Sequence, residues 1–125
     1  MNPIDLARLR DFSDGTDDGV RGFAAMFVGH MDELVTALRG AVSARNGASI
    51  REEAHRGAGT AGACGARPLA ALFLDLEALG AGHRVEEAAM LMPEVELELS
   101  RLREYIDATL ASDGSHGQPA AETPS

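Results

Sequence analysis

Residues 53–66 read Glu53-Ala54-His55-Arg56-Gly57-Ala58-Gly59-Thr60-Ala61-Gly62-Ala63-Cys64-Gly65-Ala66. Small or apolar residues recur here every three or four positions, the period of a helix with one buried face: Ile50, Ala54, Gly57, Ala61 and Cys64. At about 100° per residue, His55 lies roughly 140° from the centre of that stripe. The pattern predicts a helix that buries its small residues and carries one imidazole on the opposite face.

The neighbours of His55 on its own face of this helix are Arg51, Ala58 and Gly59, one turn away, and Gly62, two turns away; the last three have almost no side chain. A glycine inside a helix costs up to about 1 kcal/mol relative to alanine. Close packing or a docking partner has to offset that cost. We therefore expect the surface around His55 to be open to an approaching molecule.

Two other kinds of site are rejected from the same residues. Gly57 to Gly62 match G-x-G-x-x-G, but a dinucleotide site needs an apolar strand before this motif, and residues 49–56 are charged with a helical period. His30, His55 and His83 lack the spacing of metal ligands on any one helix. We therefore expect neither a nucleotide nor a metal site.

Before the central segment, the sequence predicts two helices. Asn2-Pro3 suits an N-cap followed by proline at the first helical position, and it begins a short amphipathic helix that contains Ile4, Leu6, Leu9 and Phe12. Residues 13–19 form a turn-rich linker. A long core-facing helix follows, with apolar residues at three-four spacing: Val20, Phe23, Phe27, Met31, Leu34, Leu38 and Ala41.

The central helix begins at Ser49, whose spacing to Glu52 matches a capping box, or at Asn46, which is a competing cap. Gly65 suits the position after its end, and Pro68 begins the next helix, which stops at Gly80-Ala81-Gly82. That helix buries Leu69, Leu72, Phe73, Leu76 and Leu79. The last helix buries Val85, Ala88, Met92, Val95, Leu99, Leu102, Ile106 and Leu110.

These segments predict an all-α protein, an antiparallel four-helix bundle with a short N-terminal capping helix. Residues 1–111 form one domain and residues 112–125, small and polar with two prolines, form a disordered C-terminal tail. Pro93 either kinks or restarts the last helix. Few aromatic residues are available, so Phe23, Phe27 and Phe73 are expected to anchor the core.

Charge and hydropathy limit the function. A net charge of −9 argues against a nucleic-acid partner, because a phosphate-binding surface needs excess positive charge. No apolar run approaches the length of a membrane span and no signal peptide opens the chain, so we expect a cytoplasmic monomer without a membrane partner. Cys64, the single cysteine, is expected to be a reduced core residue.

The segment from Ala54 to Glu77 resembles a histidine-containing phosphotransfer (Hpt) domain. The signature of that family runs A-H-x-L-K-G-x-x-x-x-L-G-x-x-x-L, followed by an apolar helix that reaches L-E. The matching residues are Ala54, His55, Gly59, Gly65, Ala66, Leu69, Leu72, Leu76 and Glu77. Two departures matter: the family's leucine two positions after the histidine is Gly57, which thins the core, and its lysine three positions after is Ala58, which removes a cation near the phosphoryl group.

The resemblance implies a phosphorelay carrier with no catalytic activity of its own. His55 would accept a phosphoryl group from an aspartyl phosphate on a receiver domain of a response regulator or hybrid kinase, then pass it to another receiver aspartate. Glu77 would orient His55, Gly59 would let the receiver approach closely, and Arg51 is a candidate substitute for the missing lysine. No cofactor is expected on this chain, because the receiver supplies Mg²⁺. The alternative is a bundle that docks receivers or kinases without carrying phosphate.

Overall fold

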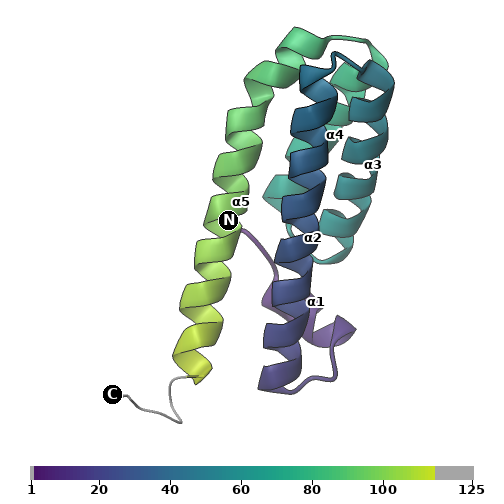
Figure 1. The fold of residues 1–125 in the computed structure, drawn as a ribbon. Helices are drawn as coiled ribbons and strands as arrows, with labels where there is room; N and C mark the ends of the chain where they lie inside the picture. The colour runs from purple at the N-terminus through teal and green to yellow at the C-terminus, as the bar shows by residue number, and fades with distance from the viewer. Residues whose placement is uncertain (1, 115–125) are drawn as a thin grey trace.

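The computed structural model describes residues 2–114, which form five helices and no strand. Four long helices lie side by side and antiparallel, and the short α1 packs at one end of the bundle (Figure 1). This confirms the predicted four-helix bundle with an N-terminal capping helix. The helices are α1 (Leu6–Phe12), α2 (Asp17–Ser43), α3 (Gly47–Ala63), α4 (Arg67–Ala81) and α5 (Val85–Gly114).

The core lies between the apolar stripes of these helices. Every residue predicted to face it from α5 is buried, and so are all those predicted from α2 except Phe23. Phe23 is half-buried because it lies at the edge of the core, which it contacts, and beside α1. Its ring stacks on that of Phe12, with the ring centroids 5.9 Å apart. Phe27 and Phe73 are core anchors as predicted, whereas Phe23 is not.

Helices α3 and α4 approach each other closely through glycine. A Cβ atom at Gly80 would lie 2.6 Å from the backbone nitrogen of Arg51 and 2.8 Å from the carbonyl oxygen of Gly47. Neither distance is compatible with a side chain, so the two backbones touch at this crossing. The contact fixes α4, and with it Glu77, against the His55 helix.

The predicted thinning of the core at Gly57 is wrong. A Cβ atom at Gly57 would lie 2.8 Å from Cδ2 of Phe73 and 3.0 Å from Cδ2 of Leu34. Phe73, which is fully buried, therefore occupies the space that a leucine would fill at position 57. Packing density is maintained by an aromatic ring from α4 instead of an aliphatic chain from α3.

Helix α1 begins later than predicted. Its N-cap is Asp5, whose carboxylate accepts a hydrogen bond from the amide of Ala7 (3.0 Å), and not Asn2. The reason is tertiary: the amide of Asp5 donates to the carbonyl of Gly65 (3.1 Å), which holds this residue against the end of α3. Arg8 adds a second bond, to the carbonyl oxygen of Ala63 (3.2 Å).

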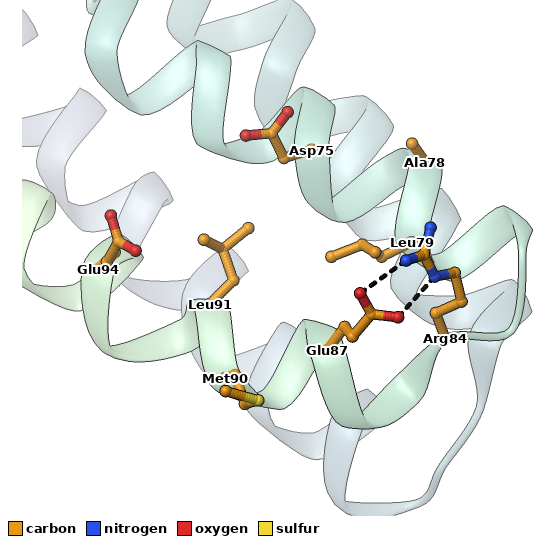
Figure 2. A pocket seen from close by; sticks show the side chains of 8 residues that line it. All are labelled: Asp75, Ala78, Leu79, Arg84, Glu87, Met90, Leu91 and Glu94. Atoms are coloured by element: carbon orange, nitrogen blue, oxygen red, sulfur yellow. Dashed lines mark hydrogen bonds and ion pairs between the residues drawn. The ribbon is translucent and has the colours of Figure 1, made fainter.

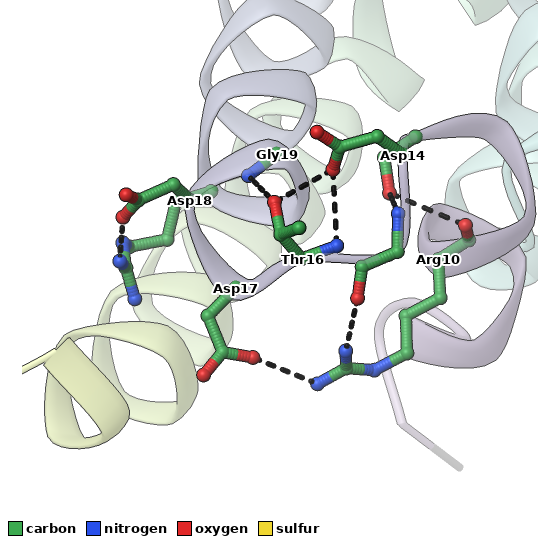
Figure 3. A network of polar contacts seen from close by, with 9 residues as sticks. Arg10, Asp14, Thr16, Asp17, Asp18 and Gly19 are labelled. Carbon is green, nitrogen blue, oxygen red and sulfur yellow. Dashed lines mark hydrogen bonds and ion pairs between the residues drawn. The ribbon is translucent and has the colours of Figure 1, made fainter.

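Capping interactions at the start of α2 fix the turn between α1 and α2 (Figure 3). The hydroxyl of Thr16 accepts a hydrogen bond from the amide of Gly19 (3.0 Å) and donates one to Asp14 (2.7 Å). This donation, with that of the Thr16 amide, lowers the pKa of Asp14. Arg10 of α1 reaches the carbonyl of Gly15 and the carboxylate of Asp17. The turn thereby sets where Phe12 lies relative to α2.

The remaining boundaries differ little from those predicted. Asn46 caps α3, and Gly65 follows α3 with a φ of +81°. Helix α5 continues through Pro93, and Figure 1 shows its N-terminal part inclined relative to the rest. It reaches Gly114, beyond the predicted domain end at residue 111; the rest of the predicted tail, 115–125, lies outside the described residues. No helix among residues 2–114 is long and apolar enough to cross a bilayer.

Candidate functional site

His55 lies at the middle of α3 with its side chain 71% exposed. Its neighbour Ala54 is fully buried in the bundle, together with Ile50 and Ala61 on the same stripe. The burial of these small residues fixes the rotation of α3 about its axis. The imidazole is therefore directed away from the core.

Glu77 of α4 holds the imidazole in one orientation. Its Oε2 lies 3.0 Å from Nδ1 of His55, while Leu76, the preceding residue, is fully buried and anchors this turn of α4 in the core. A carboxylate can only accept a hydrogen bond, so Nδ1 carries the proton that is shared with Glu77. In the neutral ring, Nε2 is then the nitrogen with a free lone pair. The geometry presents an oriented nucleophile on an open surface.

An apolar hollow of about 440 Å³ borders one side of His55. Phe12 and Phe23 line it, and the other lining residues are His55, Arg56, Gly59, Thr60, Ala63 and Cys64. A Cβ atom at Gly59 would meet nothing within 4 Å, so the backbone of α3 is uncovered here. The hollow gives a partner protein apolar surface and an unobstructed helix backbone beside the imidazole.

A charged hollow of about 350 Å³ borders the other side and is lined by Arg51, Glu52 and Arg56. The guanidinium of Arg56 binds Glu53 at 2.7 Å, whereas Arg51 makes no ion pair with the residues that the structure describes. Ala58, the position of the family's lysine, is half-buried. Arg51 is therefore the cation on this face that remains available to an incoming anion.

The other reactive side chains do not join this site. Cys64 is buried, and burial raises the pKa of its thiol, so the reactive thiolate is disfavoured. His30 and His83 are exposed on α2 and on the turn between α4 and α5. Within residues 2–114, no group of three histidine, cysteine or carboxylate side chains is placed to hold a metal ion.

A family model described as the Hpt domain matches residues 22–109, most of the chain and all of the His55 surface except α1. The chain belongs to the Hpt domain family. Members of this family are phosphocarriers of two-component phosphorelays, so the match supports histidine phosphotransfer as the class of function.

A solved structure supports the assignment of the fold. The Hpt domain superposes on the crystal structure of histidine-containing phosphotransfer protein B from Pseudomonas aeruginosa PAO1 with a TM-score of 0.78. The sequences are 22% identical over 88% of this chain and 96% of that one. No significant match was found among curated protein sequences.

Sequence reasoning missed the aromatic wall of the apolar hollow. Phe12 and Phe23 both matched the apolar face of a helix, so both were interpreted as packing residues. The place of Phe12 beside His55 depends on α1 folding back onto the end of α3, through the bonds of Asp5 and Arg8 described above. The family match begins at residue 22, so it includes Phe23 but not Phe12.

Proposed function

We propose that His55 is the phospho-accepting residue, which receives a phosphoryl group from a receiver-domain aspartyl phosphate and passes it to another receiver aspartate. The observation that carries the proposal is the pairing of an exposed imidazole with Glu77 at Nδ1, which leaves Nε2 free. No other histidine among residues 2–114 makes a hydrogen bond to a carboxylate. The partners are accordingly response regulators or hybrid kinases.

The transfer needs no proton to be removed. The lone pair of Nε2 on His55 attacks phosphorus, an N–P bond forms, and the P–O bond to the aspartate breaks with its electron pair on the leaving carboxylate. Positive charge develops on the ring as the bond forms. The carboxylate of Glu77, which accepts a hydrogen bond from Nδ1–H, stabilises that charge. In the second transfer an aspartate oxygen attacks phosphorus and the electron pair of the N–P bond returns to Nε2.

The remaining requirements of phosphoryl transfer belong to the receiver. Its Mg²⁺ and lysine neutralise the equatorial oxygens, and docking positions the two reacting groups in line. On this chain, the apolar hollow beside His55 supplies contact area and Gly59 permits close approach. Arg51 supplies positive charge on the opposite side of the ring.

Phosphorylation of purified receiver domains with acetyl phosphate, followed by mixing with this protein, tests the proposal. We expect a phosphoryl group on the parent protein that is labile in acid and stable in base, as a phosphoramidate is. His55→Gln should abolish it without lowering the melting temperature, because an exposed polar substitution changes stability by about 0.5 kcal/mol or less. His30→Gln, a matched change at an exposed histidine on α2, should leave it intact. Labelling that persists in His55→Gln would contradict the assignment.

The alternative function is docking without phosphotransfer, and the observation that favours it is Ala58 in place of the family's lysine. The same experiment separates the two. The docking function would be established by a receiver that binds the parent protein through α3 but forms no phosphoramidate on it. This result should hold at every concentration of phosphorylated receiver.

A further inference from the structure

A groove lies between α4 and α5 (Figure 2). Its apolar lining residues, which we call the floor, are Ala78, Leu79, Met90 and Leu91. The groove has a volume of about 570 Å³, within the range of binding clefts. We call it the α4–α5 groove.

The apolar surface extends beyond the groove itself. Met90 is 78% exposed, and on the same face Leu97 of α5, two turns further on, is 52% exposed. Leu74, one turn before Ala78 on α4, is 56% exposed. Single exposed apolar residues are ordinary, but these three lie on the two helices that form the groove.

The rim of the groove is acidic. Asp75 of α4 and Glu94 of α5 lie at one end, and neither is paired with a cation in the part of the chain that the structure describes. At the other end Arg84 is neutralised by Glu87, whose two carboxylate oxygens accept from its Nε and Nη2 at 2.6 Å each. The lining therefore has three carboxylates and one guanidinium, and the unpaired charges are all negative.

We propose that the α4–α5 groove binds a basic amphipathic helix of a partner protein. An apolar floor between two helices suits the apolar face of a third helix. Met90 is an unbranched, adaptable side chain of the kind used at such surfaces. The acidic rim selects arginine and lysine on the flanks of the incoming helix and repels acidic ones.

Charge also favours a basic helix over a second copy of the chain as the occupant of the groove. The protein has a net charge of −9, and a symmetric dimer through this groove would place Asp75 and Glu94 of each copy against the acidic rim of the other. An anionic lipid surface is disfavoured for the same reason. A basic helix is the occupant for which both the floor and the rim are complementary.

The groove can be filled while a receiver occupies the His55 surface. Asp75 precedes Glu77 by two residues, which places it about 200° away around α4. None of the residues that line the groove lines either hollow beside His55. The proposal therefore does not depend on phosphotransfer, and its test uses binding alone.

The test uses a fluorescent amphipathic peptide of about 18 residues, five helical turns, with a leucine face flanked by arginines. A second peptide has the same leucine face flanked by glutamates. Anisotropy titrations against the full chain give affinities, and backbone amide shifts locate the site. We expect the arginine peptide alone to bind, with shifts in α4 and α5, and its affinity to fall as salt is raised.

Two variants of the groove sharpen the test. Met90→Ser and the double change Asp75→Lys with Glu94→Lys should each weaken the arginine peptide about tenfold or more, and the double change should allow the glutamate peptide to bind. Met26→Ser, at an exposed methionine of α2, is the apolar control. Glu33→Lys with Glu104→Lys, at two exposed glutamates, changes the net charge equally and is the electrostatic control.

Four results would overturn the proposal. They are equal binding of both peptides, no binding of either at millimolar protein, control variants that weaken binding as much as the groove variants do, and amide shifts around His55 instead of the groove. Concentration-dependent dimerisation of the free protein with shifts in α4 and α5 would replace the basic helix by a second copy. The phosphotransfer assay of Met90→Ser should match that of the parent protein throughout.

Discussion

The two faces of α3 use the same residue type for opposite purposes. On the inner face, Gly57 lies under the ring of Phe73, and a single added methyl group would overlap it. On the outer face, Gly59 lies two residues further along and has nothing within 4 Å of the same position. One glycine is required by packing and the other leaves the surface beside His55 open.

This difference shows that a glycine in a helix does not by itself indicate either close packing or an open surface. Each glycine gives up helix propensity relative to alanine. At Gly57 the loss is offset by the burial of an aromatic ring from α4, which is a contribution to stability. At Gly59 no contact among the described residues offsets it, and the helix backbone beside His55 is left open to a partner. The predictions below test this distinction, beginning with the inner face.

The largest effect is expected from Gly57→Leu, which introduces the residue that the Hpt signature has at this position. Because Phe73 and Leu34 already fill the space, the variant should lose about 3 kcal/mol of unfolding free energy, as measured by urea denaturation. Phe73→Leu in the same chain should recover part of the loss by removing ring atoms. A single variant as stable as the parent protein would show that the core is not tightly packed at α3 and α4.

The next effect is on chemistry at the outer face. Glu77→Gln keeps the shape of the side chain and removes its charge. The positive charge that develops on the His55 ring in the transition state then has no carboxylate to stabilise it. We expect phosphoryl transfer to slow about tenfold or more. Nitrogen NMR of His55 should show the Nδ1–H tautomer dominant in the parent protein and mixed tautomers in the variant, a readout that a purely structural role would not change.

Glu53→Gln is the matched control for Glu77→Gln. Glu53 is also a largely buried glutamate near His55, but its carboxylate binds Arg56 at 2.7 Å rather than the imidazole. Its replacement should leave both the tautomer and the transfer rate near those of the parent protein. If the two variants slow transfer equally, general negative charge rather than orientation of the ring explains the role of Glu77.

A matched pair of alanine substitutions compares directly how the two glycines affect the stability of the protein. Gly59→Ala should stabilise the protein by about 0.5–1 kcal/mol, because it improves helix propensity in open space. Gly57→Ala should destabilise it, since its methyl group meets Phe73. Thermal unfolding of both variants measures the difference, and a common sign would refute the distinction between the faces.

The helical stripes could be predicted because each depends on one helix alone. The three-four spacing of α5 identified all of its core residues, and the position of His55 opposite the Ile50–Cys64 stripe follows from the same angle per residue. What lies across from a stripe depends on a second helix, which periodicity does not identify. The ring of Phe73 under Gly57 and the contact of Gly80 with Gly47 are therefore known only from the fold.

The N-terminal region was the least predictable part for the same reason. Asn2 and Asp5 both have a side chain that can cap a helix, and the choice of Asp5 follows from its backbone bond to Gly65, sixty positions away in the chain. That bond also brings Phe12 to Phe23 and forms the aromatic wall beside His55. The part of the site that sequence reasoning found lies on α3, with Glu77 of α4 supplied by the family resemblance, and the part that it missed is assembled from α1 and α2.

The smallest effect is expected at Arg51, on the charged side of His55. A phosphoryl group adds about two negative charges to a protein that is already at −9, and Ala58 leaves the usual lysine position without a cation. Arg51 is exposed and free of ion pairs within the described chain, so it is available to the phosphoryl oxygens. An exposed pairing of this kind changes a rate or lifetime by about two- to fivefold.

Arg51→Ala should therefore slow acceptance or shorten the lifetime of the phosphohistidine several-fold at low salt, and Ala58→Lys should improve one or both. High salt should reduce both differences, because the charges are solvated. Arg67→Ala, at an exposed arginine of α4, controls for net charge. A silent Arg51→Ala beside a faster Ala58→Lys would mean that Arg51 is no substitute and that the domain is a slower carrier. If neither variant changes the kinetics, the receiver alone supplies the electrostatics, and the outer face of α3 contributes only an oriented ring and an open backbone.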